Sequence, residues 1–141
     1  MKKYSLLLVC LVFSVVAMAQ KPVATFSEKV FDFGKINEKD GNVTHVFEFT
    51  NKGNAPLVVS RVQTSCGCTT PSWTKEPVEP GKKGSITVTF DVRNKTLFEK
   101  QIMVYTNDNQ EPVMLVIKGE VIPVSKQTEA TPKKYFQLFR Q

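Results

Sequence analysis

Residues 20–124 are predicted to form an antiparallel β-sandwich of about seven strands. The clearest sign is a stretch in which apolar and polar residues alternate strictly, with Ile86, Val88, Phe90 and Val92 on one side. Such alternation is typical of an antiparallel strand with one buried and one solvated face. Other short apolar stretches are separated by clusters of Gly, Pro and Asn, and none repeats with the period of a helix. The sequence therefore predicts an all-β domain.

The first half of this domain carries several segments with the pattern of strands. Residues 43–50 alternate regularly, and their buried face is expected to carry Val43, His45, Phe47 and Phe49. A turn cluster at 51–56 follows. Segment 57–62 is rich in β-branched residues, but its apolar residues change sides, which predicts a β-bulge. Earlier strands are expected at 23–26 and at 30–34, the second of which breaks at a glycine.

The second half of the domain continues the same pattern. Residues 77–84 are a predicted loop that ends at a glycine, immediately before the strictly alternating strand. Residues 101–106 are expected to form a strand that is closed by a turn at 107–112. In the last strand, 113–121, the sequence Lys118-Gly119-Glu120 predicts an interruption, at which Gly119 marks a bulge or a close approach of two backbones.

The N-terminal residues 1–19 are predicted to be a cleaved secretory signal peptide. Lys2 and Lys3 precede a short apolar run, and Ala17-Met18-Ala19 has the small residues of a cleavage site. The run is too short to span a bilayer, so no transmembrane segment is expected after cleavage. The protein is therefore expected to be exported, with the periplasm or cell envelope favoured over full secretion.

The C-terminal residues 125–141 differ from the domain in composition. A polar, linker-like stretch precedes a segment, 133–140, that mixes basic and aromatic residues. The tail is interpreted either as a segment packed on the domain or frayed from it, or as a contact site for a partner or a membrane surface.

The net charge suggests no nucleic-acid function. Removing Lys2 and Lys3 from the 19 basic residues leaves 17 against 13 acidic ones, a formal charge of +4 for the exported part. These basic residues are scattered along the chain, which indicates a solvated surface. Because export also separates the protein from nucleic acid, we expect no such partner.

Cys66 and Cys68, separated by Gly67, are the cysteines that remain after export, because Cys10 lies in the signal peptide. Three chemistries fit this pair in an oxidising compartment: a local disulfide, a soft site for monovalent copper, and a turn whose thiols only shape the backbone. A disulfide would close so small a loop that chain entropy gives only about 1.6 kcal/mol of stabilisation. Such a bond favours a redox role over a structural one.

No conventional enzyme constellation is present in the sequence. His45 is the sole histidine, lies within a predicted strand and is interpreted as structural. A glycine-rich phosphate loop and a carboxylate pair at catalytic spacing are both missing. Nothing in the spacing brings His45, Met103 or Met114 to the cysteine pair. We therefore expect a protein that is not an enzyme and that has no cofactor beyond the copper alternative.

Motifs occur in a fixed order along the domain: Phe31-Asp32-Phe33-Gly34, Phe49, Asn51, Gly53, Thr64-Ser65-Cys66-Gly67-Cys68-Thr69-Thr70-Pro71, Trp73, Pro80-Gly81, Gly84, Ile86, Val88, Phe90, Thr106-Asn107 and Gly119. Taken together, these motifs resemble the bacterial domain of unknown function 1573. The resemblance covers roughly residues 23–122. It implies an immunoglobulin-like sandwich, because that family is similar to the domains of the major sperm protein and Hydin types. Members are typically exported, with signal peptides of this kind common in Bacteroidota, and they lack an assigned activity.

Two hypotheses follow from the sequence. The first is an exported, non-enzymatic immunoglobulin-like module that binds another protein or a cell-envelope component, through loops or an exposed strand edge. The alternative is an envelope protein that acts through Cys66 and Cys68, by thiol–disulfide exchange or by binding monovalent copper.

Overall fold

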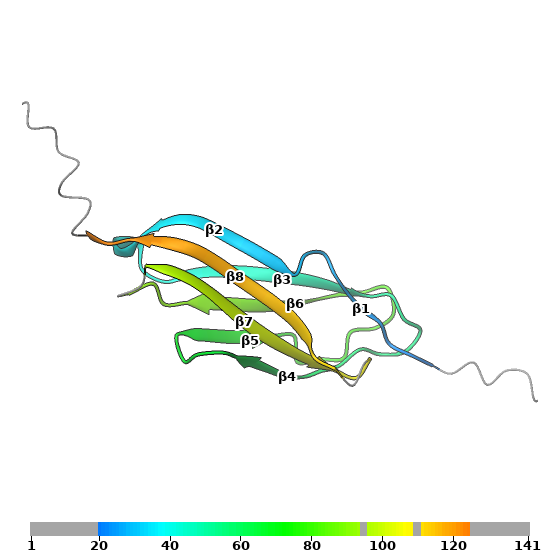
Figure 1. Cartoon of the computed structure of the whole chain (residues 1–141). Coiled ribbons are helices and arrows are strands. Elements are labelled where there is room, and N and C mark those ends of the chain that lie inside the picture. The colour runs from blue at the N-terminus through cyan, green and yellow to red at the C-terminus, as the bar shows by residue number, and fades with distance from the viewer. Residues whose placement is uncertain (1–19, 94–95, 109–110, 125–141) are drawn as a thin grey trace, which may run out of the picture.

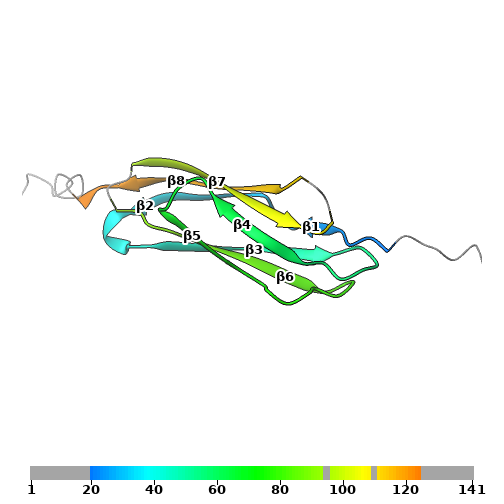
Figure 2. The same ribbon diagram turned by 90° about the horizontal axis from the view of Figure 1, so that it is seen from below.

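The computed structural model describes residues 20–93, 96–108 and 111–124, which form two facing four-stranded sheets (Figure 1, Figure 2). The predicted signal peptide, 1–19, and the predicted tail, 125–141, lie outside these residues. The first sheet has the order β1-β3-β6-β5 and the second the order β2-β8-β7-β4. The strands are β1 (Ala24–Phe26), β2 (Val30–Asn37), β3 (Val43–Asn51), β4 (Val59–Thr64), β5 (Thr69–Trp73), β6 (Lys83–Phe90), β7 (Leu97–Thr106) and β8 (Val113–Ile122), with a 3₁₀ turn at Glu38–Asp40.

This strand order is that of an immunoglobulin domain. β1, β3, β6 and β5 occupy the positions of strands A, B, E and D, and β4, β7 and β8 those of strands C, F and G. After β1 the chain crosses to the second sheet, where β2 pairs with β8 in parallel. The predicted immunoglobulin-like sandwich is confirmed, but the expectation of purely antiparallel pairing was wrong for this one strand pair.

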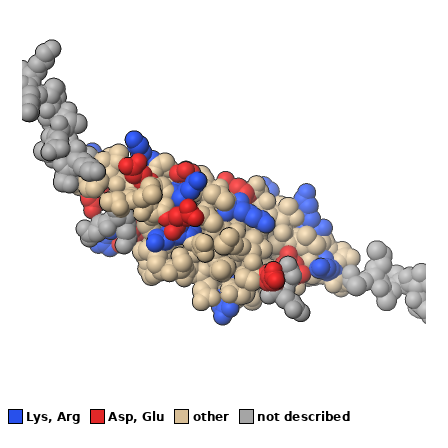
Figure 3. Space-filling view, viewed as in Figure 1, with Lys and Arg blue, Asp and Glu red and all other residues tan. Residues whose placement is uncertain are grey.

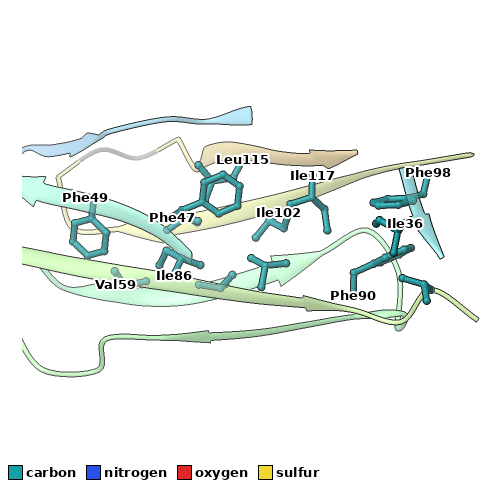
Figure 4. Close-up of a cluster of buried hydrophobic side chains, with 14 of the residues drawn as sticks. Ile36, Phe47, Phe49, Val59, Ile86, Phe90, Phe98, Ile102, Leu115 and Ile117 are labelled. Carbon is teal, nitrogen blue, oxygen red and sulfur yellow. The ribbon is translucent and has the colours of Figure 1, made fainter. Parts of the chain in front are cut away.

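The core lies between the sheets and follows the predicted alternation. Phe47 and Phe49 of β3 and Ile86, Val88 and Phe90 of β6 are at most 1% exposed, so the inward faces assigned to these strands are confirmed. They meet inward side chains of β7 and β8, including Ile102, Leu115 and Ile117 (Figure 4). Burying each such side chain stabilises the fold by about 1.5–3 kcal/mol.

The close approach predicted at Gly119 is confirmed. A Cβ on Gly119 would lie 2.9 Å from Cζ of Phe98 and 3.1 Å from the carbonyl oxygen of Gly34. The predicted interruption at 118–120 was wrong, because β8 runs through it unbroken.

The irregularity lies instead in β2, whose register shifts between Asp32 and Lys35. The expected end of this strand at Gly34 was wrong. Gly34 takes a positive φ of 65° at the shift, which lets the chain bulge and then resume pairing with β8.

Two other predictions concern β4 and β5. The bulge expected in segment 57–62 is confirmed by a register shift between Val59 and Arg61. Strand β5, which follows the cysteines and includes Pro71, was not among the predicted strands. A proline is tolerated there because β5 is an edge strand, paired on one side only with β6.

Other strand boundaries also differ from expectation, including that of β4, which covers 59–64 and not 57–62. β6 begins at Lys83 and not after the glycine of the 77–84 loop, and β7 begins at Leu97, four residues before the predicted start. Asn51, assigned to a turn, is the last residue of β3 and is fully buried.

Asn51 organises one end of the sandwich, which we call the amide end and which comprises residues 20–23, 52–58, 74–82, 107–108 and 111–112. Its Nδ2 donates to the carbonyl oxygens of Ala55 (2.7 Å) and Val78 (2.8 Å). Its Oδ1 accepts from the backbone N–H groups of Gly53 (2.9 Å) and Val23 (3.2 Å). One buried amide thus holds three separate chain segments together.

Two further side chains support the amide end. Asn107 accepts from the N–H of Val58 (2.8 Å) and donates to the carbonyl oxygen of Pro56 (3.1 Å). Asp108 accepts from the N–H of Ala24 at 2.8 Å. The Asn51-x-Gly53 and Thr106-Asn107 motifs therefore serve the same end of the fold.

Candidate functional site

The cystine loop, residues 65–68, connects β4 of the second sheet to β5 of the first. It lies at the end of the sandwich opposite the amide end. This cystine end also contains residues 38–42, 91–93, 96 and 123–124, which are brought together where β2, β6 and β8 finish and β3 and β7 begin.

Cys66 and Cys68 are joined by a disulfide, with their Cα atoms 5.4 Å apart. This separation lies in the usual range for disulfides. Both cysteines are half-buried, Cys68 packs against the hydrophobic core, and Gly67 between them is exposed. Because the bond closes a single short connection, it does not pin the two sheets together.

Hydrogen bonds hold the backbone of the cystine loop independently of the sulfur atoms. The Thr64 hydroxyl donates to the carbonyl oxygens of Cys66 (3.0 Å) and Thr69 (3.3 Å). The Asp91 N–H donates to the carbonyl oxygen of Cys68 at 2.9 Å. The N–H of Ser65 donates to the carbonyl oxygen of Gln101 at 3.1 Å. Both flanks of the cystine are therefore anchored to neighbouring strands.

Two groups beside the cystine are relevant to its chemistry. The Thr69 hydroxyl is buried, and its Oγ1 lies 3.7 Å from Sγ of Cys66. Asp91 binds the exposed guanidinium of Arg93, with Oδ2 and the nearer Nη 2.6 Å apart. That hydrogen bond, together with the carboxylate charge, raises the pKa of Arg93 above its ordinary value.

The other metal-ligand candidates of the sequence are not brought to the cystine. The His45 ring stacks on Phe31 with centroids 3.5 Å apart, and its Nε2 lies 2.9 Å from Oε1 of Glu28, which supports the structural interpretation. Met103 and Met114 face each other across β7 and β8. Among the described residues, no three His, Cys, Asp or Glu side chains gather as a metal would need. Copper binding would first require reduction of the disulfide, because thiolates are the ligands.

The remaining residues of the predicted motif have structural positions. The indole N–H of Trp73 donates to the carbonyl oxygen of Val59 at 3.2 Å, which closes the seam between β5 and β4. The Lys75 ammonium lies 3.1 Å from the centroid of the Trp73 ring. Pro80 and Gly81 lie at the amide end, where the N–H of Gly81 donates to the carbonyl oxygen of Asn51 at 2.7 Å.

A second candidate surface, which we call the apolar face, is part of the outer side of β2, β8, β7 and β4. Val30 and Met114 are 53% and 47% exposed there, and Val116, Met103 and Tyr105 are half-buried. The Arg61 guanidinium lies 4.1 Å from the centroid of the Tyr105 ring. The members of this face are Val30, Arg61, Gln63, Gln101, Met103, Tyr105, Met114 and Val116.

Two hollows lined by described residues lie on this side of the second sheet. One, of about 250 Å³, is lined by side chains of β4 and β7 and reaches the cystine loop through Thr64 and Ser65, although neither sulfur lines it. The other, of about 430 Å³, lies near Gly34 and Gly119 and has charged walls. Those walls include Asp32, Lys35, Glu99, Lys118 and Glu120.

The outer side of the first sheet is very different. β3, β5 and β6 present mainly hydroxyl side chains there, and Thr44 and Thr89 hydrogen-bond across the strands at 3.0 Å. By contrast, Figure 3 looks onto the outer side of the second sheet, where acidic and basic side chains are interspersed rather than gathered by sign. The hydroxyl face consists of Thr25, Thr44, Val46, Glu48, Thr50, Thr70, Ser72, Ser85, Thr87 and Thr89.

Sequence reasoning did not identify the apolar face. Its signal was present in residues 101–106 and 113–117, which carry apolar side chains at nearly every position instead of at alternate ones. Since one face of each strand fills the core, the other apolar set must be exposed.

Comparison with known proteins gives a family and a fold. Residues 24–121 match the family described as "Protein of unknown function (DUF1573)". A protein of unknown function from Porphyromonas gingivalis W83 is 20% identical, with a TM-score of 0.63 over 77% of this chain and 50% of that one. Vibrio cholerae VesB protease is 16% identical, with a TM-score of 0.54 over 69% of this chain and 31% of that one. At these identities the two structures show a shared fold alone.

No curated protein matches the chain significantly. The chain spans half the length of the Porphyromonas protein and less than a third of VesB, so neither comparison concerns a whole protein. Within the described residues, no helix has the length and apolar character needed to cross a membrane.

Proposed function

Because the chain belongs to the DUF1573 family, whose description states no function, we propose a role from its structure: an exported, non-enzymatic immunoglobulin-like module that binds another protein through its apolar face. The predicted signal peptide supports the exported location. The observation that carries the binding role is the contrast between the two outer faces. One face is covered by hydroxyl groups, whereas the other exposes Met, Val and Tyr side chains beside an arginine.

The composition of the apolar face suits a protein partner. Aromatic residues, methionine and arginine are enriched in protein interfaces relative to other surface, while lysine and glutamate are depleted. Met103, Met114, Tyr105 and Arg61 provide these residue types in adjacent register positions of β4, β7 and β8. The charged side chains around the larger hollow lie at one end of this set, as a polar rim would.

The non-enzymatic part of the proposal is supported by the surroundings of His45. Its ring is 15% exposed, stacks on Phe31 and pairs with Glu28. It is therefore engaged in packing and is not directed at either hollow. Turnover by the purified domain that a point substitution abolishes would contradict this part of the proposal.

Site-specific photo-crosslinking tests the binding role in cells that export the chain. A crosslinking residue is placed at Met114 on the apolar face, and the matched control carries it at Thr87 on the hydroxyl face. We expect a protein adduct of one defined mass from position 114 and none from position 87.

Substitution of single residues on the apolar face then distinguishes specific binding of a partner from random collision with other proteins. Met103→Lys should abolish the adduct, while Thr89→Lys on the opposite face should leave it intact. With the purified partner, Tyr105→Ala should weaken binding about tenfold or more if this ring is an interface anchor. Equal adducts from both faces, or an adduct that persists in Met103→Lys, would refute the assignment.

A further inference from the structure

We propose that Cys66 and Cys68 form a reversible dithiol–disulfide couple, which exchanges with thiols while the sandwich stays folded. This activity is independent of the proposed binding role, since it concerns the cystine loop and not the apolar face. Three observations carry it: the position of the disulfide in a single connection, the hydrogen bonds that anchor the loop, and the buried hydroxyl beside Cys66.

The first observation concerns what reduction would disrupt. Stabilising disulfides link distant chain segments, and their effect grows with the length of the closed loop. Cys66 and Cys68 are separated by one residue and link neither sheets nor strands. Cleavage of the bond therefore leaves every strand pairing of the sandwich in place.

The second observation concerns the reduced loop. The hydrogen bonds of Thr64 to Cys66 and Thr69, of Asp91 to Cys68, and of Ser65 to Gln101 use backbone oxygens and nitrogens but no sulfur. They can persist when the disulfide is open. The two thiols are thus expected to remain near each other and to be ready to reoxidise.

The third observation assigns roles to the two sulfurs. Both cysteines are half-buried, but Cys68 packs against the core whereas Cys66 lies between exposed Ser65 and Gly67, so we assign Sγ of Cys66 as the target for a thiolate. The Thr69 hydroxyl, 3.7 Å from this sulfur, can donate to it when it carries a negative charge.

Exchange with a dithiol proceeds in two steps. A thiolate of the donor attacks Sγ of Cys66, the Cys66–Cys68 bond breaks, and Cys68 leaves as a thiolate that takes a proton from water. The second thiolate of the donor then attacks the donor's other sulfur, which is bonded to Sγ of Cys66 in the mixed disulfide. Cys66 leaves as a thiolate beside Thr69 and is protonated. The donor becomes a disulfide, and the protein gains two electrons and two protons.

The first experiment measures reduction and folding on the same sample. The purified chain is equilibrated in dithiothreitol or glutathione redox buffers without denaturant, quenched with acid, alkylated and weighed by intact mass. We expect a two-label species to increase as the buffer becomes more reducing, while circular dichroism retains the strand signal. Dithiothreitol should give direct reduction, and glutathione should also give a trapped adduct of one glutathione.

The second experiment separates the roles of the sulfurs. Cys68→Ser leaves Cys66 alone and Cys66→Ser leaves Cys68 alone, which makes a matched pair. With oxidised glutathione, Cys68→Ser should form its mixed disulfide at least several times faster than Cys66→Ser.

Thr69→Val, added to Cys68→Ser, tests the hydroxyl with a near-isosteric side chain. It should move the pH midpoint of Cys66 alkylation upward and slow the release of Cys66 from its mixed disulfide. A purely structural role of Thr69 would leave that midpoint unchanged.

The proposal is overturned if the disulfide stays oxidised in strongly reducing buffer until the chain is unfolded by denaturant. It is also overturned if the two-label species appears only together with loss of the strand signal. Failure of the crosslinking experiment would not affect either result, so the two proposals can fail separately.

Discussion

The amide end and the cystine end of the sandwich hold their loops in different ways. At the amide end, Asn51 is fully buried and its side chain makes four hydrogen bonds to backbone groups of separate segments. At the cystine end, a covalent bond joins two residues that are already close neighbours in sequence, and exposed Ser65 and Gly67 flank it. The covalent bond therefore lies at the end of the sandwich that depends on it least. The cystine can consequently react without loss of the fold.

The first prediction, which has the largest expected effect on stability, concerns the aromatic packing that stabilises the cystine end. Phe90 pairs with Thr69 at the start of β5, is fully buried, and stacks on Phe98 with centroids 4.1 Å apart. Phe90→Ala should lower the free energy of unfolding by about 3–5 kcal/mol, because it removes a buried aromatic ring and leaves a cavity. Denaturant unfolding measures this value, and a loss below about 1 kcal/mol would contradict the assigned core.

The second prediction breaks the amide end. Asn51→Ala should cost about 3 kcal/mol, because it leaves the buried carbonyl oxygen of Ala55 and the N–H of Gly53 without this partner. It also removes one of the two hydrogen bonds to the carbonyl oxygen of Val78, which keeps only that from the N–H of Leu57. Asn54→Ala is the control, since its exposed amide accepts one bond from the N–H of Lys21 and should cost at most about 1 kcal/mol. Equal losses in the two variants would show that Asn51 does not organise this end.

The third prediction compares Gly84, at the start of β6 next to the amide end, with Gly67 of the cystine loop. A Cβ on Gly84 would overlap the ring of Phe49, whereas a Cβ on Gly67 would meet nothing within 4 Å. Gly84→Ala should therefore cost about 1–3 kcal/mol through overpacking. Gly67→Ala should change stability by at most about 0.5 kcal/mol, as surface substitutions usually do. Thermal melts of the pair give the comparison, and a larger loss in Gly67→Ala would contradict it.

The sequence predicted those parts of the fold that depend on local alternation. The inward faces of β3 and β6, the bulge in 57–62 and the close approach at Gly119 all have a signature in neighbouring residues, and all are present. The features that were missed depend on distant pairing. The parallel pairing of β2 with β8 joins segments far apart in the chain, and no local pattern records it.

The candidate site likewise combines features with a local sequence signature and features that depend on residues distant in the chain. The motif Cys66-Gly67-Cys68 could be identified from spacing alone. The hydrogen bonds of Cys68 to Asp91, just after β6, and of neighbouring Ser65 to Gln101 of β7 could not, because these residues are distant in sequence. Strand β5 could not be recognised from the sequence because it contains Pro71. A proline argues against a central strand, and the sequence does not reveal that β5 is an edge strand. Asn51 belongs to a cluster, 51–56, that has the composition of a turn. Only the loops packed around it in the structure show that its side chain is a buried hydrogen-bonding centre.

The most direct test of this account is the stability of the disulfide-bonded chain against that of the same chain reduced, in parallel denaturant titrations. We predict that reduction lowers the free energy of unfolding by about 1 kcal/mol, and by no more than the roughly 1.6 kcal/mol that loop entropy allows, with an unchanged denaturant slope. A loss of about 3 kcal/mol or more, comparable to that of Phe90→Ala, would contradict the claim that the cystine is dispensable for the fold.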